Sequence, residues 1–298
     1  MTLLAYESSM SMGHHNVFYR DMEGLPWPGY RWKAVTELWR RLKAGHALTI
    51  PHHLGIRWGV ADVPLTGPEL QEVHTDTRKR MGGPALDWTL PHDPVLRPAL
   101  EIYSKHGQSE YFNPGDPLAY EQVKYTGGSS VEGAHYAQDA WAAGHVMGTV
   151  AASDNHTAQP GLMNTGITAV YAPELTREAI FDSILNRRTY ATTGERIILD
   201  FELGEVRMGA EGKTAGETKG SIKVIAPSDI RFVEVLAYDY GAGWKPAVRW
   251  DAPGKELREA FSVTPSAKGS VYYVRIELEV KTSNRVARAW SSPIWINR

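Results

Sequence analysis

The chain has 298 residues, of which 42% are hydrophobic and 22% charged, with a formal net charge of −2 and no cysteine. These values are typical of a globular protein of one or two domains, and they exclude disulfides and thiolate metal ligands. No basic stripe is present, which argues against a nucleic-acid partner. No apolar run reaches the roughly 18 residues of a membrane span, and no signal peptide is visible. We therefore expect a cytoplasmic protein that acts on a small-molecule substrate.

Strands and helices are expected to alternate over residues 1–194. Strands are predicted at "TLLAYE", "HALTIPHH", "ALEIYS", "VMGTVAAS" and "TGITAVYA". Helices are predicted at residues 34–44, 67–83, 133–145 and 176–188, from apolar spacing and from glycine or arginine at their ends. This alternation predicts an α/β fold, either an open sheet or a barrel.

The pattern changes after Gly194. Runs such as "SIKVIAP", "FVEVLAYDY" and "VYYVRIELEV" alternate apolar and polar residues, and turn-forming residues separate them. This texture is typical of antiparallel strands. The sequence therefore predicts an α/β domain at residues 1–194 and a sandwich-like β domain at residues 195–298.

Metal-compatible side chains gather at the ends of four predicted strands. Glu7 ends the first, and His14 and His15 follow it in a loop; His52 and His53 end the second. The third strand contains Glu101 and leads to His106, and the fourth ends at Asp154 and His156. In α/β folds, functional groups collect beyond the carboxyl ends of the strands. Four such strand ends indicate a shared site.

Each of these residues also has an ordinary interpretation. A lone loop histidine is usually a solvated or capping residue and not a ligand, and we assign His46, His74, His92, His135 and His145 to that class. Side chains alternate along a strand, so at most one of His52 and His53 is expected to face the site. Glu101 can be a paired core carboxylate, and Asp154 can cap a turn.

Imidazoles and carboxylates that converge without sulfur are suited to Zn²⁺, Mn²⁺ or Fe. A metal held there lowers the pKa of bound water toward about 7 and makes it a nucleophile. A serine nucleophile has less support because "GGSS" lacks the Gly-x-Ser-x-Gly pattern, and no phosphate-cradling glycine motif is present.

Several motifs resemble, in order, a family of uncharacterised bacterial proteins related to the PHP (polymerase and histidinol phosphatase) metallohydrolases. They are "AYESSMSMGHHNVFYRD", "LTIPHHLG", "LEIYSKHGQSE", "MGTVAASDNHTAQPG", "REAIFDSILNRRTYATTGERI" and the terminal "ARAWSSPIWI". The resemblance covers most of residues 5–205 and implies a distorted (β/α) barrel. It also implies that Glu7 bridges metals, and that His14 and His52 are preferred over His15 and His53 as ligands. Asp154 and His156 match the family's Asp-x-His ligand pair.

In one respect the chain departs from the family. PHP domains begin with His-x-His, and this sequence contains none. The chain starts near what would be the third or fourth barrel strand, so we expect an incomplete barrel, from a fragment or a short relative. We therefore expect one or two divalent ions, held by Glu7, His14, His52, Asp154 and His156. Apolar edges left by missing strands predict a homo-oligomer.

The resulting hypothesis is a metal-dependent hydrolase that uses activated water on a phosphoester. His106 and Asp154 are the expected catalytic residues, and His53, Lys105 and Arg57 are the expected substrate-binding residues, of which His106, Lys105 or Arg57 can steady developing negative charge. One alternative keeps the metal and hydrolyses carboxylic esters, carbamates or lactones. Another is an inactive barrel relic whose β domain binds a carbohydrate or protein through the aromatic residues of "YDYGAGWKPAVRW".

Overall fold

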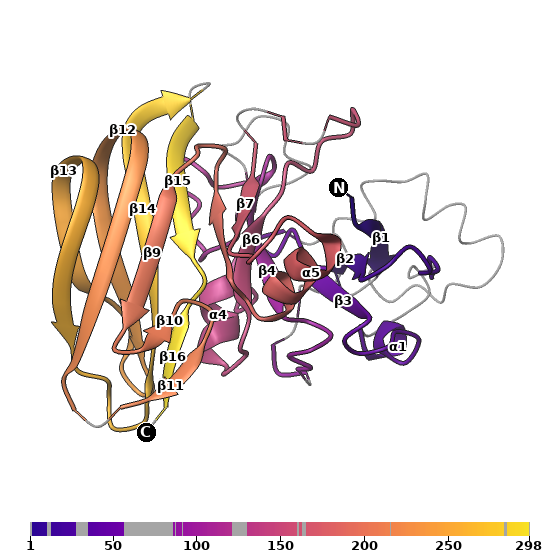
Figure 1. Ribbon diagram of the computed structural model, residues 1–298, viewed down its shortest axis with the longest axis horizontal. Coiled ribbons are helices and arrows are strands. Elements are labelled where there is room, and N and C mark those ends of the chain that lie inside the picture. The colour runs from indigo at the N-terminus through magenta and orange to yellow at the C-terminus, as the bar shows by residue number, and fades with distance from the viewer. Residues whose placement is uncertain are drawn as a thin grey trace.

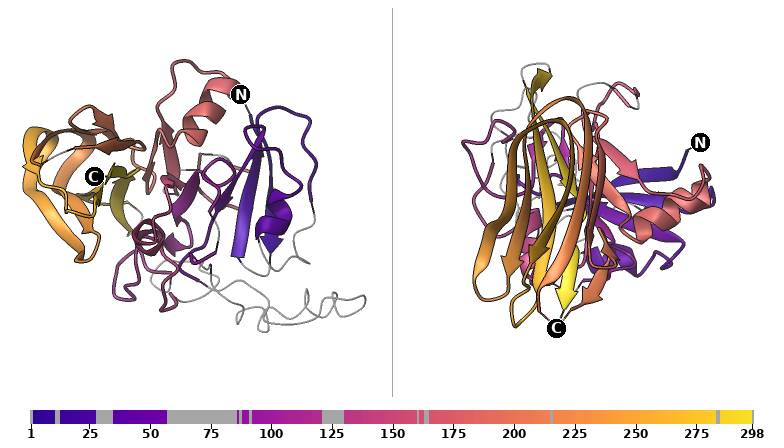
Figure 2. Two further views of the ribbon diagram at one scale, coloured as in Figure 1. Left: turned by 90° about the horizontal axis from the view of Figure 1, so that it is seen from below. Right: turned by 60° about the vertical axis from the view of Figure 1, so that its left-hand side comes forward.

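The computed structural model describes residues 2–10, 13–27, 35–56, 86, 88–90, 92–120, 130–159, 161–162, 165–214, 216–282 and 285–297. These residues form three sheets, arranged from the N-terminal sheet at one end of the molecule to a large C-terminal sheet at the other (Figure 1). The two end sheets lie on opposite sides of the central strands (Figure 2). Among the described helices, none is long and apolar enough to cross a membrane.

The N-terminal sheet has the order β1-β2-β3 and is antiparallel throughout. Its strands are β1 (Leu4–Met10), β2 (Gly13–Tyr19) and β3 (Ala47–Pro51). Helix α1 (Val35–Trp39) packs its buried Leu38 against the β2 side chain of Val17. Burial of both side chains anchors β2, because fully burying an aliphatic side chain contributes about 1.5–3 kcal/mol.

A small central sheet has the order β5-β4-β6. It consists of β4 (Ala99–Ser104), β5 (Gly107–Gln108) and β6 (Gly148–Ala151), with α4 (Ala137–Ala142) preceding β6. Strands β4 and β6 are parallel, and β4 and β5 form a tight antiparallel hairpin. Helix α5 (Arg177–Leu185) buries Phe181 and Ile184 against residues of β3, β4 and β6, which ties this sheet to the N-terminal one.

The third sheet has ten strands and is almost entirely antiparallel. Its members are β7 (Ile167–Val170), β8 (Thr189–Thr192), β9 (Ile198–Leu203), β10 (Val206–Arg207), β11 (Glu211–Lys213), β12 (Thr218–Asp239), β13 (Gly243–Val263), β14 (Ser270–Thr282), β15 (Arg285–Ser291) and β16 (Ile294–Asn297). The first half of β12 pairs with β9 and its second half with β14, with register shifts around Ile230. The sheet therefore curves over its own apolar core and is sandwich-like, as predicted for the C-terminal region.

The predicted α/β fold with a PHP-like (β/α) barrel is wrong. A barrel of that kind needs parallel strands with a helix after each. The described residues contain three short helices, and the only parallel pairs among them are β4–β6 and β11–β16. The expected strands are present, but most are joined antiparallel. Because "SIKVIAP" and "FVEVLAYDY" both lie in β12, two predicted strands are one.

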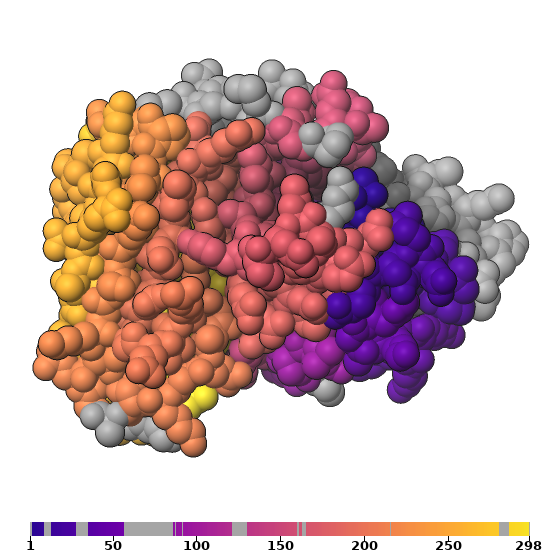
Figure 3. Space-filling view, viewed as in Figure 1, coloured from indigo at the N-terminus to yellow at the C-terminus, as the bar shows by residue number. Residues whose placement is uncertain are grey.

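Hydrogen bonding continues across the predicted domain boundary at residue 194. Strand β8 pairs with β15 through Thr192 and Ala289, so strands from both sides belong to one sheet. Figure 3, in the orientation of Figure 1, shows the middle of the chain filling the space between the N-terminal and C-terminal ends of the molecule. The division into two domains stays a prediction. The predicted helix at residues 67–83 lies outside the described residues.

Candidate metal centre

Glu7 and His14 meet across the β1–β2 pair. Residues 13–19 form a strand where a loop was predicted, and they alternate between the two faces of the sheet. His14 lies opposite Ser9 in the register, which brings its Nδ1 to 2.6 Å from Oε1 of Glu7. His15 points to the other face and is fully buried. The structure therefore selects His14 over His15 for this site, through strand alternation.

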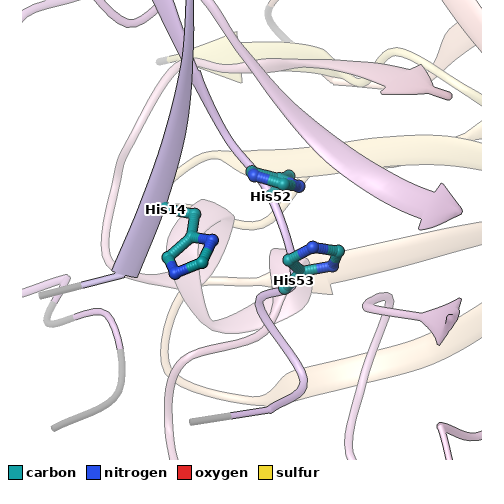
Figure 4. A group of neighbouring side chains, drawn as sticks. All are labelled: His14, His52 and His53. Atoms are coloured by element: carbon teal, nitrogen blue, oxygen red, sulfur yellow. The ribbon is translucent and has the colours of Figure 1, made fainter. Parts of the chain in front are cut away.

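His52 and His53 follow β3, and their rings lie near that of His14 (Figure 4). Their ring centroids lie 3.9 Å apart, and each lies within 6.0 Å of the His14 ring. The expectation that only one of the pair faces the site fails because β3 ends at Pro51. His53 has a left-handed φ of 57°, which breaks the alternation. Such a conformation costs about 1–3 kcal/mol in a non-glycine residue and occurs often at functional sites.

His106 and Asp154 approach the same point from the central sheet. His106 occupies the turn between β4 and β5, and Asp154 follows β6. Asp154 also has a left-handed φ, of 47°. Its Oδ2 lies 2.9 Å from Nε2 of His106 and 3.0 Å from Nε2 of His53. The parallel pairing of β4 and β6 places both loops at one sheet edge, as the strand-end argument predicts.

His53 joins these side chains into one centre. His14, His52 and His53 offer three nitrogen ligand atoms within 4.8 Å of one another, and His53, His106 and Asp154 offer a second such group. Each group contains donors that zinc, manganese and iron accept. The arrangement accommodates one ion in either group, or two ions with His53 between them.

Glu101 lies under this centre; the sequence placed it in a strand that leads to the site, but not among the expected metal ligands, catalytic or substrate-binding residues. It is 3% exposed, and its Oε1 lies 3.9 Å from Nδ1 of His52. Burial raises the pKa of Glu101 well above its usual range, and the negative charges of Asp154 and Glu7 raise it further. A carboxyl behind a ligating histidine is a common feature of metal sites, where it orients the ring. Its place inside an apolar strand was the available signal.

The donor set fits a divalent cation. His52 is 3% exposed, and its two ring nitrogens have long contacts, 3.5 Å to Oε1 of Glu7 and 3.9 Å to Oε1 of Glu101. Contacts this long offset only part of the cost of burying the ring nitrogens, which is about 1–3 kcal/mol for a group left without a partner. Three carboxyl groups, those of Glu7, Glu101 and Asp154, converge here, and the site is lined mainly by imidazoles. A bound cation would satisfy both the imidazoles and the acids.

Two carboxylates are held in the charged form. Hydrogen bonds from His14 and His52 lower the pKa of Glu7. Burial alone would raise the pKa of Asp154, but contacts with His106 and His53 outweigh burial and lower it. His53 has a pKa lowered to about 3, mainly by burial and then by His52. At neutral pH the site therefore presents anionic oxygens and a neutral imidazole, the forms that bind metal.

His156 and Lys105 lie at the rim. Nζ of Lys105 lies 2.7 Å from Nδ1 of His156, and the His156 ring centroid is 6.4 Å from that of His106. The structure thus brings Glu7, His14, His52, His53, His106 and Asp154 together but keeps His156 beside the lysine. Arg57, the third predicted substrate-binding residue, lies outside the described residues.

The histidines predicted to be ordinary lie outside the candidate centre, although His135 and His145 are buried and not solvated. His46 contacts Asp21, His135 contacts the Leu54 carbonyl oxygen, and His145 contacts the Trp88 carbonyl oxygen. His92 stacks near His145, with ring centroids 4.7 Å apart. His74 lies outside the residues that the structure describes. The number of histidines therefore did not indicate which side chains converge, whereas their position at the ends of predicted strands did.

Comparisons with known proteins place the Asp154 region in a recurring sequence context. A family model described as a protein of unknown function (DUF3604) matches residues 145–206. An uncharacterized protein of Chlamydia trachomatis serovar D is 30% identical over 148 residues, which is 44% of this chain and 22% of that protein. One from Chlamydia muridarum is 31% identical over 44% of this chain and 22% of its own length. One from Chlamydia pneumoniae is 27% identical over 68% of this chain and 35% of its own length.

The chain thus corresponds to between 22% and 35% of the length of these curated relatives. Among solved structures, the CARDB domain of the PF1109 protein from Pyrococcus furiosus, in complex with di-metal ions, aligns with 34% of this chain and 88% of that domain. Its sequence identity is 15% and its TM-score 0.20. A similarity this low supports no inference about this chain.

The buried groups of the centre predict a specific pH dependence of stability. Unfolded histidine takes up a proton near pH 6.5, whereas folded His53, with a pKa of about 3, does not. Its contribution to stability is therefore present above pH 6.5 and is lost as the pH falls toward 3. His15 and His92, whose pKa values burial also lowers, act in the same direction. Glu101 acts in the opposite direction, because its raised pKa makes the folded state keep a proton that the unfolded state releases.

We expect the free energy of unfolding of the metal-free protein to fall between pH 6 and pH 5. In Glu101→Gln the opposing proton is absent, so the fall should be steeper by up to about 1.4 kcal/mol per pH unit. Urea unfolding at the two pH values, in the presence of a chelator, measures this slope. Equal slopes in the two proteins would show that Glu101 is ionised in the folded state.

Proposed function

We propose that this chain is the metal-binding part of a metal-dependent hydrolase that acts on a phosphoester. The observation that carries the proposal is the pair of three-residue groups that share His53 and join the ends of β2, β3, β4 and β6. The order of motifs that resembles the PHP-related family supports the same class of chemistry, although the described residues do not form that family's barrel.

Glu7, His14, His52, His53 and Asp154 would hold one or two ions of Zn²⁺, Mn²⁺ or Fe. When bound, such an ion supplies a Lewis acid that lowers the pKa of water and polarises the substrate. Glu101 lies behind the His52 ring, with its Oε1 3.9 Å from Nδ1, close enough to restrict the orientation of that ring. The left-handed backbone at His53 and Asp154 directs both side chains inward. These features pre-organise the donors before substrate arrives.

Lys105, His106 and His156 are placed to serve the substrate. Lys105 and His156 form a polar pair beside His106, whose Nε2 contacts Asp154. A lysine ammonium at the rim attracts a phosphoryl group, because that group is negatively charged. A carboxylic ester is neutral and is not attracted in this way. When the ion occupies the group of His14, His52 and His53, His106 does not ligate it and can hold a proton for the leaving group while Asp154 orients its ring. This cationic rim is why we prefer a phosphoester over a carboxylic ester or lactone.

The aromatic residues of the C-terminal sheet give the binding-module alternative little support. The Trp244 ring packs against Tyr238, Tyr273 and Trp141, and Trp250 packs against Phe261. These rings serve the protein's own core more than an external ligand. Homo-oligomer formation stays a prediction; within the described residues, β1 is an edge strand that pairs with β2 alone.

Hydrolysis of generic nitrophenyl esters tests the proposal. With Mn²⁺ or Zn²⁺ added, we expect turnover of a phosphate monoester or diester to exceed that of nitrophenyl acetate. Asp154→Asn should lower kcat/KM by at least about 100-fold, which corresponds to roughly 2.7 kcal/mol of transition-state stabilisation. Glu195→Gln, a substitution outside the site, is the control. Faster hydrolysis of the acetate would favour the carboxylic ester alternative, and turnover unaffected by a chelator would contradict the metal.

A further inference from the structure

A cavity of about 610 Å³ lies away from the histidine centre. Its walls come from the end of β7, the link between α5 and β8, strand β9 and the segment from β10 to β11, and none of them carries a residue of the metal centre. Its volume is within the range of small-molecule binding sites, about 300–1,000 Å³. Neither the predicted chemistry nor the motifs above account for it.

Arg187 is fixed in one wall of this cavity. Its backbone has a left-handed φ of 59°, and its Nε donates a hydrogen bond of 2.8 Å to the carbonyl oxygen of Gly209. Gly209 has no room for a side chain, because a Cβ there would lie 2.1 Å from the Arg187 carbonyl oxygen. Two backbone segments are thus in direct contact around this guanidinium. A guanidinium held in this way loses little further entropy when it binds a carboxylate.

The cavity also contains acidic side chains, and the negative charge of Glu211 acts on Arg187. Asp200 and Glu211 line it together with Arg187 and Arg188. Among the ion pairs of the described residues, none joins either of these acids to either of these arginines. Arg207, also in the lining, is paired outward with Glu202 at 2.8 Å. Both signs of charge therefore remain available to a ligand.

We propose that this cavity binds a small zwitterion, an α-amino acid or the equivalent end groups of a short peptide. The carboxylate pairs with Arg187, and the ammonium group pairs with Asp200 or Glu211. Met208 and Tyr171 offer apolar surface to the ligand's side chain. A simple anion such as phosphate is disfavoured, because the two acids repel it. A neutral sugar would leave the charged side chains of the cavity without a partner of opposite charge.

Titration of the full chain with the twenty α-amino acids tests the proposal, followed by end-blocked forms of the best one. We expect at least one amino acid to bind at millimolar or lower concentration. Its N-acetyl and amide derivatives should bind at least about tenfold more weakly, because each lacks one charge. Inorganic phosphate should bind more weakly than the amino acid.

Two variants separate binding from folding. Arg187→Gln should weaken binding of the amino acid by at least about tenfold, and Arg258→Gln, on an exposed part of β13, should leave it unchanged. Asp200→Asn keeps the Arg187 contacts and should reduce the difference between the amino acid and its N-acetyl form. Binding of no amino acid, equal binding of the blocked forms, or full binding by Arg187→Gln would overturn the proposal. Metal content is unaffected by any of these outcomes.

Discussion

Replacing His53 by alanine is expected to lower the affinity for Zn²⁺ or Mn²⁺ by at least about 100-fold, since changes even to outer residues of a metal site cost 10–100-fold. His53 belongs to both three-residue groups, and its Nε2 lies 3.0 Å from Asp154. The alanine variant therefore removes a donor from each group. It also removes the imidazole that contacts the Asp154 carboxylate. Calorimetric titration of the chelator-treated protein with Zn²⁺ or Mn²⁺ measures the change in affinity.

His156→Ala is the matched comparison, because His156 contacts Lys105 and lies in neither group. We expect its effect on metal affinity to stay below about tenfold, a difference of about 1.4 kcal/mol. His53→Gln keeps most of the side-chain volume and distinguishes lost ligation from lost packing. A larger effect for His156→Ala than for His53→Ala would restore the Asp-x-His pair as the principal ligands and contradict the geometry described above.

Replacing Glu110 by alanine is expected to destabilise the protein by about 3–5 kcal/mol, the usual cost of breaking a buried ion pair from one side. Glu110 is fully buried and accepts hydrogen bonds from Arg275 at 3.0 Å, from Trp290 at 2.7 Å and from Tyr273. All three donors belong to β14 and β15 of the large sheet. Glu110 therefore ties the segment after His106 to that sheet.

Urea unfolding measures this effect, and the surface pair of Glu256 and Arg258 provides the control. Glu256→Ala should change the free energy of unfolding by less than about 1 kcal/mol, as exposed pairs do. Because His106 lies four residues before Glu110, the Glu110→Ala variant should also bind metal more weakly than wild type under folding conditions. A loss of stability below about 1 kcal/mol would show that Arg275 finds a sufficient partner in Glu234 alone.

Most strand positions could be predicted from the sequence, but their pairing could not. The apolar runs at residues 47–51, 99–104 and 148–151 are strands, as expected. The periodicity of apolar residues does not indicate whether neighbouring strands run parallel or antiparallel. In addition, β2 was predicted as a loop, so the antiparallel hairpin of β1 and β2 was counted as one strand and a loop. Its β-branched and aromatic run at residues 17–19 was the available signal. With that hairpin in place, the alternation that predicted a barrel is lost.

The candidate site was predictable as a set of residue types at strand ends, and less so as a geometry. Glu7, His14, His52 and Asp154 do converge. His53 was not predicted as a ligand, because the alternation of side chains holds only within a strand and β3 ends at Pro51. The left-handed φ of 57° at His53 cannot be predicted from the residue type. Glu101 escaped because a carboxylate inside an apolar strand has two interpretations. The structure is needed to show that Glu101 lies behind His52.

The metal content of the purified protein tests the central claim most directly. After expression in medium supplemented with zinc, manganese and iron, followed by desalting, elemental analysis should find about one or two divalent ions per chain. The double variant with His53→Ala and Asp154→Ala, purified in parallel, should retain fewer than about a tenth as many. A wild-type protein that is folded, yet carries no stoichiometric metal and binds none on titration, would contradict the account.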